Sequence, residues 1–389
     1  MNNRRFSSEP PASDRSVLSA LNGHNNSLGI IRLVLALAVI ASHAYPLGGF
    51  GVEPLIDVLG ASDSLGAIAV AGFFAISGYL VLRSALSGDV FQFMWKRVLR
   101  IFPGYWVALL VGVLAVGPLI WLLERRELGD YFRSGVGSIY SYLASNADLS
   151  IGPWGVWDIF ASTTPYGEAT GASVFNGSIW TLTYEWSSYL AAAALLGLGL
   201  LRFTRLTVLF TAAVFGVANV LYHLQPQFAA ATVGIVMDGY LASLGFLFFV
   251  GASIGAYADK IRFTTWVGVA SGVIVVVSLF AGGWKIFGYL AMPYFLLWVA
   301  TILPQRLQWI GQKNDYSYGI YLYGFLVQQT TAYFGLHKLG IELWIALSMV
   351  ISFGLAWLSW KLIERPAINL KSVGPGRGFR YWWSKLTKR

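Results

Sequence analysis

The sequence predicts an all-α fold: a polytopic membrane bundle of about ten transmembrane helices, with one long outer loop that contains a re-entrant helix. Three observations support this prediction. Hydrophobic residues make up 56% of the 389 residues, whereas charged residues make up only 12%. Apolar segments of roughly 20 residues, the length that crosses a bilayer, recur along nearly the whole chain. Basic residues gather in alternate connections between these segments, as they do on the cytoplasmic side of a membrane.

The predicted spans follow from the apolar runs, taken in order along the chain. They cover residues 28–45, 65–86, 98–123, 178–201, 206–224, 240–257, 263–280, 284–303, 316–336 and 341–363. If the N-terminus is cytoplasmic, most of the 27 Lys and Arg residues fall in inner loops and tails. Both termini are therefore predicted to lie in the cytoplasm, and the protein in the cell membrane. The stretch GASIG at 251–255 predicts a close contact between helices.

The two ends of the chain differ in composition from the membrane domain, which we predict over residues 28–366. Residues 1–27 are polar, rich in Ser, Asn and Pro, and lack the apolar core of a signal peptide. We expect a disordered cytoplasmic tail there. Residues 367–389 mix basic and aromatic side chains. They form a cytoplasmic tail that lies on an anionic leaflet or is simply solvated.

Composition also excludes several classes of function. The chain contains no cysteine, so disulfides, thiolate catalysis and cysteine-based metal sites are ruled out. No HExxH motif or Gly-rich nucleotide loop stands out, and we predict no metal. The net charge of +9 would by itself suggest nucleic acid. Because the basic residues follow the predicted inner loops, we expect a lipid bilayer as the partner and no nucleic acid.

The one long connection, residues 124–177, is predicted to lie outside. A long loop on one face of a compact bundle is often functional. Within it, residues 136–150 are moderately apolar but short for a span. An eleventh crossing there would invert every later loop against the charge pattern. A re-entrant or interfacial helix is therefore favoured, and a spanning helix stays open.

Two ionisable residues, Arg32 and His43, interrupt the first predicted span in IIRLVLALAVIASHAYPL (30–47). Eleven residues make three helical turns plus about 20°, so both side chains share one face, about 16 Å apart in depth. A central Arg costs about 2.5–3.5 kcal/mol in a bilayer, which favours a functional role. Snorkelling of Arg32 to the inner interface and hydrogen-bonded packing of His43 are the structural alternatives.

A third intramembrane residue, Glu185, lies in NGSIWTLTYEW (176–186). Its helix enters from outside, which places Glu185 at a depth comparable to that of His43. A carboxylate beside an imidazole raises the imidazole pKa and selects its tautomer, as a general base requires. The alternative is an ion pair of Glu185 with Arg32 or another cation.

The segment KRVLRIFPGYW (96–106) places Lys96, Arg97 and Arg100 at the cytoplasmic mouth of the third predicted span. Arg97 and Arg100 are three residues apart and project from one helix face. Clustered guanidinium groups suit a phosphorylated ligand that approaches from the cytosol. The alternative is that these residues only follow the positive-inside rule.

Together these motifs resemble the acyltransferase-3 family of integral membrane O-acyltransferases, from about residue 28 to residue 366. The resemblance rests on Arg32 with His43, GFFAISGYLV (72–81) with Ser77, Arg97 with Arg100, SIWTLTYE (178–185) with Trp180 and Glu185, YSYGIYLYG (316–324) with Ser317 and Tyr318, and IERP (363–366). The chain departs from many members at Gly324, where they have a histidine. It also stops before the C-terminal esterase-like domain that some members carry.

The resemblance implies transfer of an acyl group, usually acetyl, from cytosolic acyl-CoA to a hydroxyl of an extracytoplasmic or lipid-linked glycan. It implies that His43 acts as general base or carries the acyl group, oriented by Glu185, with Arg32 holding the donor deeper in the bundle. The remaining implied roles are phosphate binding by Lys96, Arg97 and Arg100, and pocket lining by Ser77, Trp180, Ser317 and Tyr318. Acceptor identity, acyl chain length and homo-oligomerisation stay open.

A transporter or flippase is the alternative class of function. In that case Arg32, His43 and Glu185 would form a relay for a proton or a substrate. Transporters often show duplicated halves with broken helices in corresponding positions, and no such repeat stands out here. An acyltransferase-like scaffold without chemistry is a further alternative, and the intact Arg, His and Glu residues argue against it.

Overall fold

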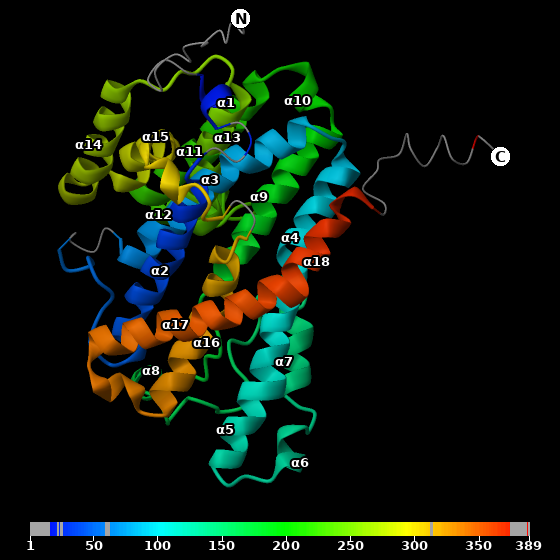
Figure 1. Ribbon diagram of the computed structural model, residues 1–389, viewed down its shortest axis with the longest axis vertical. Helices are drawn as coiled ribbons and strands as arrows, with labels where there is room; N and C mark the ends of the chain where they lie inside the picture. Colours follow the sequence, from blue (N-terminus) through cyan, green and yellow to red (C-terminus); the bar gives the residue numbers. More distant parts are fainter. Residues whose placement is uncertain are drawn as a thin grey trace, which may run out of the picture. The chain divides into compact units, whose positions relative to one another are not determined.

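The computed structural model describes residues 16–21, 23, 26–58, 63–311, 314–373 and 387. Within these ranges every regular element is a helix, apart from one isolated bridge between Ser16 and Arg262. The predicted all-α class is thereby confirmed for the described part of the chain. Most of both predicted tails, residues 1–15 and 374–386, lies outside the described residues. The chain divides into two compact units, whose helices are labelled in Figure 1.

The first unit comprises residues 1–31, 75–83 and 205–313. Helix α13 (Gly239–Ala256) is central to it, because both α11 (Leu206–Leu224) and α15 (Tyr289–Ile302) pack against α13. Helix α14 (Thr265–Ala281) packs on α15. The smaller elements are α1 (Val17–Ala20), α12 (Pro226–Thr232), the π-helix η3 (Trp284–Gly288) and the 3-10 helix η4 (Gln305–Leu307).

Glycines let α3 (Leu65–Leu86) approach α13 closely inside the first unit. A Cβ atom at Gly78 would lie 1.9 Å from the carbonyl oxygen of Phe248, and one at Gly251 would lie 2.2 Å from that of Ala75. Gly251 begins the GASIG stretch. The helix contact predicted for that stretch is therefore confirmed, and its cause is the missing side chain.

The second unit comprises residues 32–74, 84–204 and 314–389. It holds most of α2 (Leu28–Leu47) and both ends of α3. Its other elements are α4 (Val90–Val111), η2 (Gly112–Val116), α5 (Gly117–Leu123), α6 (Leu128–Tyr131), α7 (Ile139–Asn146), α8 (Pro165–Thr170), α9 (Trp180–Gly197), α10 (Leu200–Phe203), α16 (Ser317–Tyr333), η5 (Leu336–Leu339), α17 (Ile341–Ser359), η6 (Trp360–Glu364), α18 (Arg365–Asn369) and η7 (Leu370–Ser372). Helix α16 packs on both α17 and α4.

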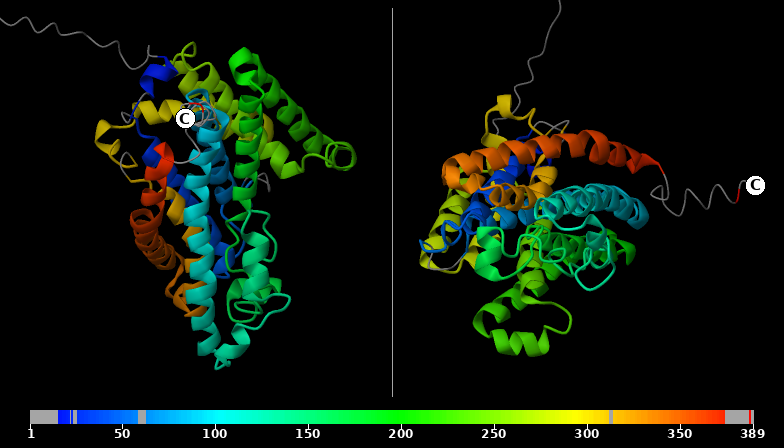
Figure 2. Two further views of the ribbon diagram at one scale, coloured as in Figure 1. Left: turned by 90° about the vertical axis from the view of Figure 1, so that its right-hand side faces the viewer. Right: turned by 90° about the horizontal axis from the view of Figure 1, so that it is seen from below.

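Two long continuous helices, α4–η2–α5 and α17–η6–α18, run through the second unit (Figure 2). Prolines explain where each of them widens into a π-helical turn. Pro118 and Pro366 have no N–H, so the carbonyls of Leu114 and Leu362 lose their α-helical donors. Both carbonyls lie inside the π-helical turns η2 and η6. Turn η6 carries Glu364, which is only 1% exposed.

Seven helices in the described part of the chain are long and apolar enough to cross a membrane. They are α2, α3, α4 to α5, α11, α13, η3 with α15, and the helix from α17 to η7. Helix α14 is apolar but shorter. The predicted spans 178–201 and 316–336 form helices α9 and α16, which are not among the seven. Helix α16 carries polar side chains that lower its hydropathy. It buries 15 of its 17 residues, so these side chains contact protein rather than lipid.

The long connection after α5 contains the short helices α6, α7 and α8. Helix α7 has 8 residues, and such a helix rises about 12 Å, too little to cross a core about 30 Å thick. The hydroxyl of Tyr105 and the indole N–H of Trp106, both on α4, donate to the carbonyls of Asn146 and Ala147 at 2.7 and 2.8 Å. This long connection is thus packed against α4.

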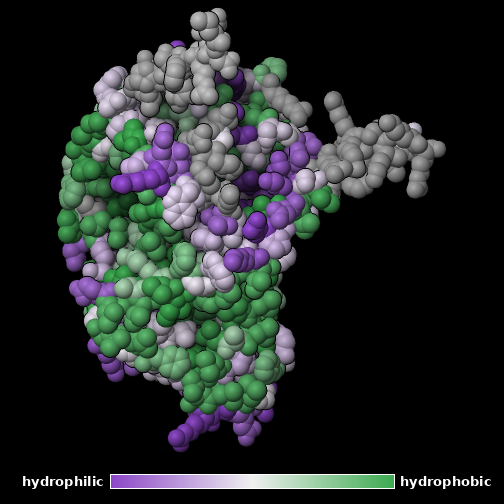
Figure 3. All heavy atoms as spheres, viewed as in Figure 1, coloured by the Kyte–Doolittle hydropathy of each residue, from purple (hydrophilic) through white to green (hydrophobic). Residues whose placement is uncertain are grey.

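The C-terminal end of α5 marks a change from apolar to charged surface. Leu119, Leu122 and Leu123 are 47%, 51% and 49% exposed, and the charged run 124–127 follows directly. In Figure 3 this appears as green side chains over α5 with purple side chains beyond its end. Exposed leucines followed by charges are what a helix leaving a bilayer requires. The protein is accordingly a multi-pass membrane protein.

Candidate functional site

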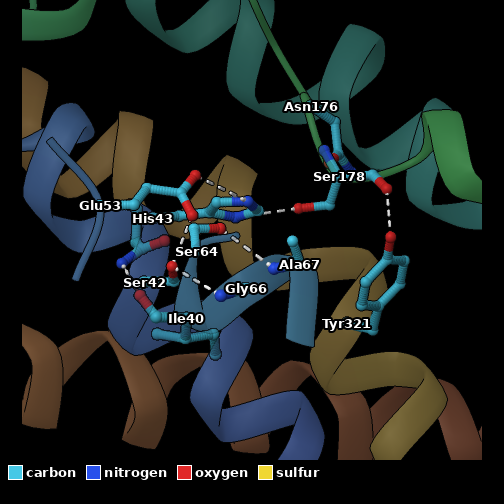
Figure 4. Close-up of polar contacts among 11 residues, drawn as sticks. Ile40, Ser42, His43, Glu53, Ser64, Gly66, Ala67, Asn176, Ser178 and Tyr321 are labelled. Carbon is cyan, nitrogen blue, oxygen red and sulfur yellow. Dashed lines mark hydrogen bonds and ion pairs between the residues drawn. The ribbon is translucent and has the colours of Figure 1, made fainter. Parts of the chain in front are cut away.

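His43 lies one turn before the end of α2 and faces two other segments of the second unit (Figure 4). Its Nε2 atom is 3.9 Å from Oε1 of Glu53, in the connection from α2 to α3. Its Nδ1 atom is 3.4 Å from Oγ of Ser178, just before α9. The ring also meets the ring of Phe325 edge-on, with centroids 5.5 Å apart. The imidazole therefore bridges a carboxylate and a hydroxyl.

Glu53 is held in place by the ends of two helices. The hydroxyl of Ser42, on α2, donates to Oε2 of Glu53 at 2.5 Å and accepts from the N–H of Gly66 at 2.8 Å. Gly66 lies in the first turn of α3, and a Cβ there would be 3.1 Å from both Ser42 Oγ and Glu53 Oε2. The glycine thus leaves room for the contact that directs the carboxylate toward His43.

Ser178 is fixed through its backbone. Its N–H donates to Oδ1 of Asn176 at 3.1 Å, while the Asn176 amide donates to the carbonyl of Leu322 at 2.7 Å. The hydroxyl of Tyr321 donates to the Ser178 carbonyl and is hydrogen-bonded to the hydroxyl of Thr181. Both Asn176 and Ser178 are buried. The segment before α9 is therefore tied to α16, with one serine hydroxyl left to face His43.

At the other end of α2, Arg32 forms an ion pair with Asp315. Arg100, on α4, contacts the same carboxylate oxygen at 2.6 Å. The hydroxyl of Ser317 donates to the second oxygen at 2.5 Å. Burial opposes ionisation of Asp315, yet the two guanidinium groups hold its pKa well below the usual range. Arg32 is thus a paired residue, and its partner lies far away in the sequence.

Arg97 lies one turn before Arg100 and has a different environment. Its guanidinium lies over the rings of Phe93 and Tyr189, at 5.9 and 5.6 Å from their centroids. One nitrogen donates to the hydroxyl of Ser84 at 3.5 Å, and Nε is buried with no hydrogen-bond partner in the described part of the chain. Arg97 therefore has donor capacity to spare. Lys96, its neighbour, is half-buried.

Glu185, predicted to lie beside His43, accepts a hydrogen bond from the hydroxyl of Tyr189 on the next turn of α9. The ring of Tyr189 also lies under Arg97. Tyr189 thus links Glu185 to Arg97, one of the three arginines (Arg32, Arg97 and Arg100) that we call the arginine cluster. The carboxylate at ion-pair distance from His43 is Glu53. Depth in the membrane, the basis for predicting Glu185, does not indicate Glu53. The available signal was that Glu53 is the first acid after the first span.

Two of the residues predicted to line the pocket, Ser317 and Tyr318, belong to the Asp315 cluster. Ser317 bonds to Asp315 through its hydroxyl. The Tyr318 hydroxyl donates to the carbonyl of Ile101 at 2.8 Å, and its ring lies 5.3 Å from the guanidinium of Arg100. Contact of either residue with a substrate stays a prediction.

The other two predicted lining residues lie elsewhere. Trp180, in the first turn of α9, meets the ring of Tyr184 edge-on at 5.6 Å. Ser77 is half-buried on the part of α3 that belongs to the first unit. Their roles also stay predictions.

Gly324, where the resemblance led us to look for a histidine, is a point of contact between α16 and α2. A Cβ there would lie 2.8 Å from a side-chain carbon of Ile40. One turn further on, the amide of Gln328 donates to the Ile40 carbonyl at 2.8 Å. A side chain at position 324 would have to displace Ile40.

In comparisons with known proteins, the matching family and two of three relatives are named for acyl or acetyl transfer. The acyltransferase domain family matches residues 25–361. Over 368 residues the chain is 30% identical to an "O-acetyl transferase" of Shigella phage Sf6, covering 90% of this chain and 97% of that protein. It is 31% identical over 376 residues to "nodulation protein 10" of Rhizobium leguminosarum bv. viciae, covering 90% and 95%. It is also 28% identical over 165 residues to "acyltransferase MdmB" of Streptomyces mycarofaciens, covering 42% and 37%. No solved structure matches.

Proposed function

The chain belongs to the acyltransferase-3 family, and from this premise we propose that it moves an acetyl group from cytosolic acetyl-CoA to a hydroxyl of an extracytoplasmic or lipid-linked glycan. Membership of the family makes the protein a membrane acyltransferase and sets aside the transporter alternative. The similarity to a phage O-acetyl transferase supports an oxygen acceptor and an acetyl group. The donor, the acceptor and the residue roles that follow belong to the proposal.

The observation that carries the proposal is the position of His43 between Glu53 and Ser178. A carboxylate near Nε2 favours the tautomer with its proton there and stabilises the imidazolium form. The lone pair then lies on Nδ1, which can accept a proton from a hydroxyl. His43 is accordingly the base that activates an attacking alcohol. Glu53 takes the orienting role that sequence reasoning had assigned to Glu185.

The arginine cluster supplies the donor end of the site. Arg32 and His43 lie on one face of α2, separated by about 16 Å of helix. A donor whose phosphates meet the cations near Arg32 can extend its thioester along that face toward His43. Arg97 and Lys96 are the principal phosphate ligands in this arrangement, because Arg32 and Arg100 already share Asp315. A guanidinium group can donate two parallel hydrogen bonds to one phosphate group, and this geometry suits the binding of the donor's phosphates.

The outer loop is the proposed acceptor surface. Among the residues that the structure describes, six other than glycine have positive φ, namely Leu55, Arg125, Leu149, Ile151, Trp157 and Phe160. All of them lie in the α2–α3 connection or in the outer loop. Such conformations cost of order 1–3 kcal/mol each, persist only where surrounding structure holds them, and cluster at functional sites. Five of the six, all except Leu55, lie in the outer loop, and this supports a shaped binding surface on that loop.

The test uses the purified full chain with radiolabelled acetyl-CoA and envelope membranes as the source of acceptor. The wild-type protein should move label into the membranes, and His43→Ala should lower the rate by roughly 10²–10⁴-fold. His337→Ala, in η5, is the matched control and should retain activity. Label that stays on coenzyme A with the wild-type protein would refute the proposed donor. Equal activity of the two histidine variants would remove the proposed base.

A further inference from the structure

We propose that Ser178 carries the acyl group as a covalent ester between donor and acceptor, an inference that rests on the proposed function. Ser178 Oγ lies 3.4 Å from Nδ1 of His43, and Nε2 of the same ring lies 3.9 Å from Oε1 of Glu53 (Figure 4). A hydroxyl, a base within reach of it and an acid that orients the base make up the arrangement of nucleophilic acyl transfer. The three residues come from three separate segments of the second unit.

The hydroxyl of Ser178 differs from other serine hydroxyls of the same helix region. Those of Ser187 and Ser188 donate to the carbonyls four residues earlier, at 2.9 and 2.8 Å. That is the usual contact of serine within an apolar helix. Ser178 instead has both backbone groups bonded to Asn176 and Tyr321, and its side chain faces the imidazole. The local structure thus places this hydroxyl for His43.

The position of Ser178 at the start of α9 adds to the argument. Ser178 directly precedes Ile179, the N-cap of α9. The N-terminus of a helix of 18 residues carries partial positive charge. Negative charge that develops on a carbonyl oxygen beside Ser178 would be stabilised there.

The proposed reaction has two balanced steps. First, Ser178 Oγ attacks the thioester carbonyl while its proton passes to His43 Nδ1. The carbon–sulfur bond breaks, the thiolate takes that proton, and free coenzyme A leaves an acetyl ester on Ser178. Second, an acceptor hydroxyl attacks the ester carbonyl and gives its proton to Nδ1. The bond from the acetyl carbon to Oγ breaks, and Oγ takes the proton back. No oxidant or reductant is consumed.

The competing explanation is that Ser178 only positions His43, while donor and acceptor react directly in one complex. The two routes differ when the acceptor is absent. A covalent route releases one coenzyme A per protein in a rapid burst and leaves label on the chain. A direct route releases none until the acceptor arrives.

The experiment mixes the full chain in detergent with radiolabelled acetyl-CoA and no acceptor, and follows coenzyme A release and label on the protein. The wild-type protein should show a burst, with label on the peptide that contains Ser178. In the Ser178→Ala variant, the burst of coenzyme A, the label on the protein and the transfer to envelope membranes should each fall by roughly 10³-fold or more. Ser188→Ala is the matched control, a buried serine of α9 away from His43, and should keep all three.

A cysteine variant keeps the test decisive if the alanine variant folds poorly. The chain contains no cysteine, so Ser178→Cys introduces a single thiol at the proposed nucleophile. Acetyl label on it should be a thioester, which neutral hydroxylamine releases, and acetylation should protect the thiol from alkylation. Absence of this label from an active S178C protein overturns the proposal.

The remaining outcomes separate this inference from the proposed function. Wild-type protein that transfers label to membranes without a burst, or S178A that still transfers it, overturns the acyl-serine alone. Label recovered on His43 instead of Ser178 likewise overturns the acyl-serine alone. Wild-type protein that neither releases coenzyme A nor transfers label overturns the proposed donor, and the inference with it.

Discussion

The two basic residues of α2, Arg32 and His43, each have a carboxylate beside them that comes from outside this helix. Asp315 pairs with Arg32 at one end of the helix, and Glu53 faces His43 near the other. An unpaired charge in a buried position is strongly destabilising, so partners of this kind are expected. The two pairs differ in their bonding. Asp315 has three hydrogen-bonding partners, Arg32, Arg100 and Ser317, whereas His43 is left at 3.9 and 3.4 Å from its neighbours. The pair of His43 and Glu53, which has the longer distance, is the one suited to proton transfer.

Glu53→Gln tests the pairing of His43 at the residue scale. The substitution keeps the shape of the side chain but removes the charge that stabilises the imidazolium form. We expect acetyl transfer to fall by roughly 10²–10⁴-fold, as when the orienting acid of a catalytic triad is neutralised. Membrane abundance of the protein should stay unchanged. The comparison variant is Glu185→Gln, whose carboxylate accepts a hydrogen bond from Tyr189 rather than facing His43. A larger loss in E185Q than in E53Q would restore the pairing expected from sequence.

Asp315→Asn tests the arginine cluster. It removes the charge that the guanidinium groups of Arg32 and Arg100 both contact, and breaking a buried pair typically costs about 3–5 kcal/mol. Asp158→Asn is the control, because its pair with Arg126 is more exposed, and such pairs contribute about 0–1 kcal/mol. Thermal unfolding in detergent should show the larger drop for D315N. Equal drops would mean that Asp315 contributes little to folding.

The same carboxylate predicts a dependence of stability on pH. The pKa of Asp315 is lower in the folded protein than the value of about 3.9 for an unperturbed Asp. Its contribution is therefore fully present above pH of about 4 and is lost as the pH falls through the folded-state pKa. Acid unfolding of wild-type protein should be steeper than that of D315N below this pH. Parallel acid-unfolding curves would contradict the pairing.

At the scale of elements, two helices depart from what a membrane span needs. Helices α9 and α16 carry hydroxyl and amide side chains that lower their hydropathy, and α16 is buried along most of its length. Gln328 and Gln329, both fully buried on α16, donate to the carbonyls of Ile40 and Val174. Such bonds between elements hold α16 against α2 and the segment before α9. Polarity in these helices therefore reflects contact with protein rather than with lipid.

Gly78→Ala tests how the glycines join α3 to α13. The added methyl group would meet the backbone of Phe248 at 1.9 Å, so the helices must separate. Overpacking of this kind costs about 1–3 kcal/mol. Gly354→Ala, on α17, is the matched control because nothing lies within 4 Å of its Cβ, and alanine there gains about 1 kcal/mol of helix propensity. The melting temperature should fall for G78A and hold or rise for G354A. The reverse order would show that the α3–α13 contact is loose.

At the scale of the whole molecule, the predicted topology sets which side of the membrane each loop occupies. The absence of cysteine makes single-cysteine labelling direct. Val136→Cys, at an outer-loop residue 98% exposed, should react with a membrane-impermeant maleimide in intact cells. Ser87→Cys, between α3 and α4, should react only after the cells are permeabilised. Labelling of both in intact cells would remove the predicted alternation, and the opposite pattern would invert it.

Local features of the sequence were enough to predict much of this protein. Runs of apolar residues predict the helices because both helix formation and partition into a bilayer depend on side chains close together in the chain. The shared face of Arg32 and His43 follows from helix periodicity alone. The order of motifs predicts the acyltransferase family, which the comparisons confirm.

Only the tertiary structure decided which side chains meet. It brings Asp315 to Arg32 across 283 positions of sequence, and it places Glu53 rather than Glu185 against His43. It also turns the Ser178 hydroxyl toward that imidazole. These contacts depend on how separate helices and their connections pack, and no periodicity or spacing within one segment encodes that packing. The depth of a residue in the membrane gives only one coordinate of its position. A hydrogen bond requires two side chains to lie close together in all three coordinates.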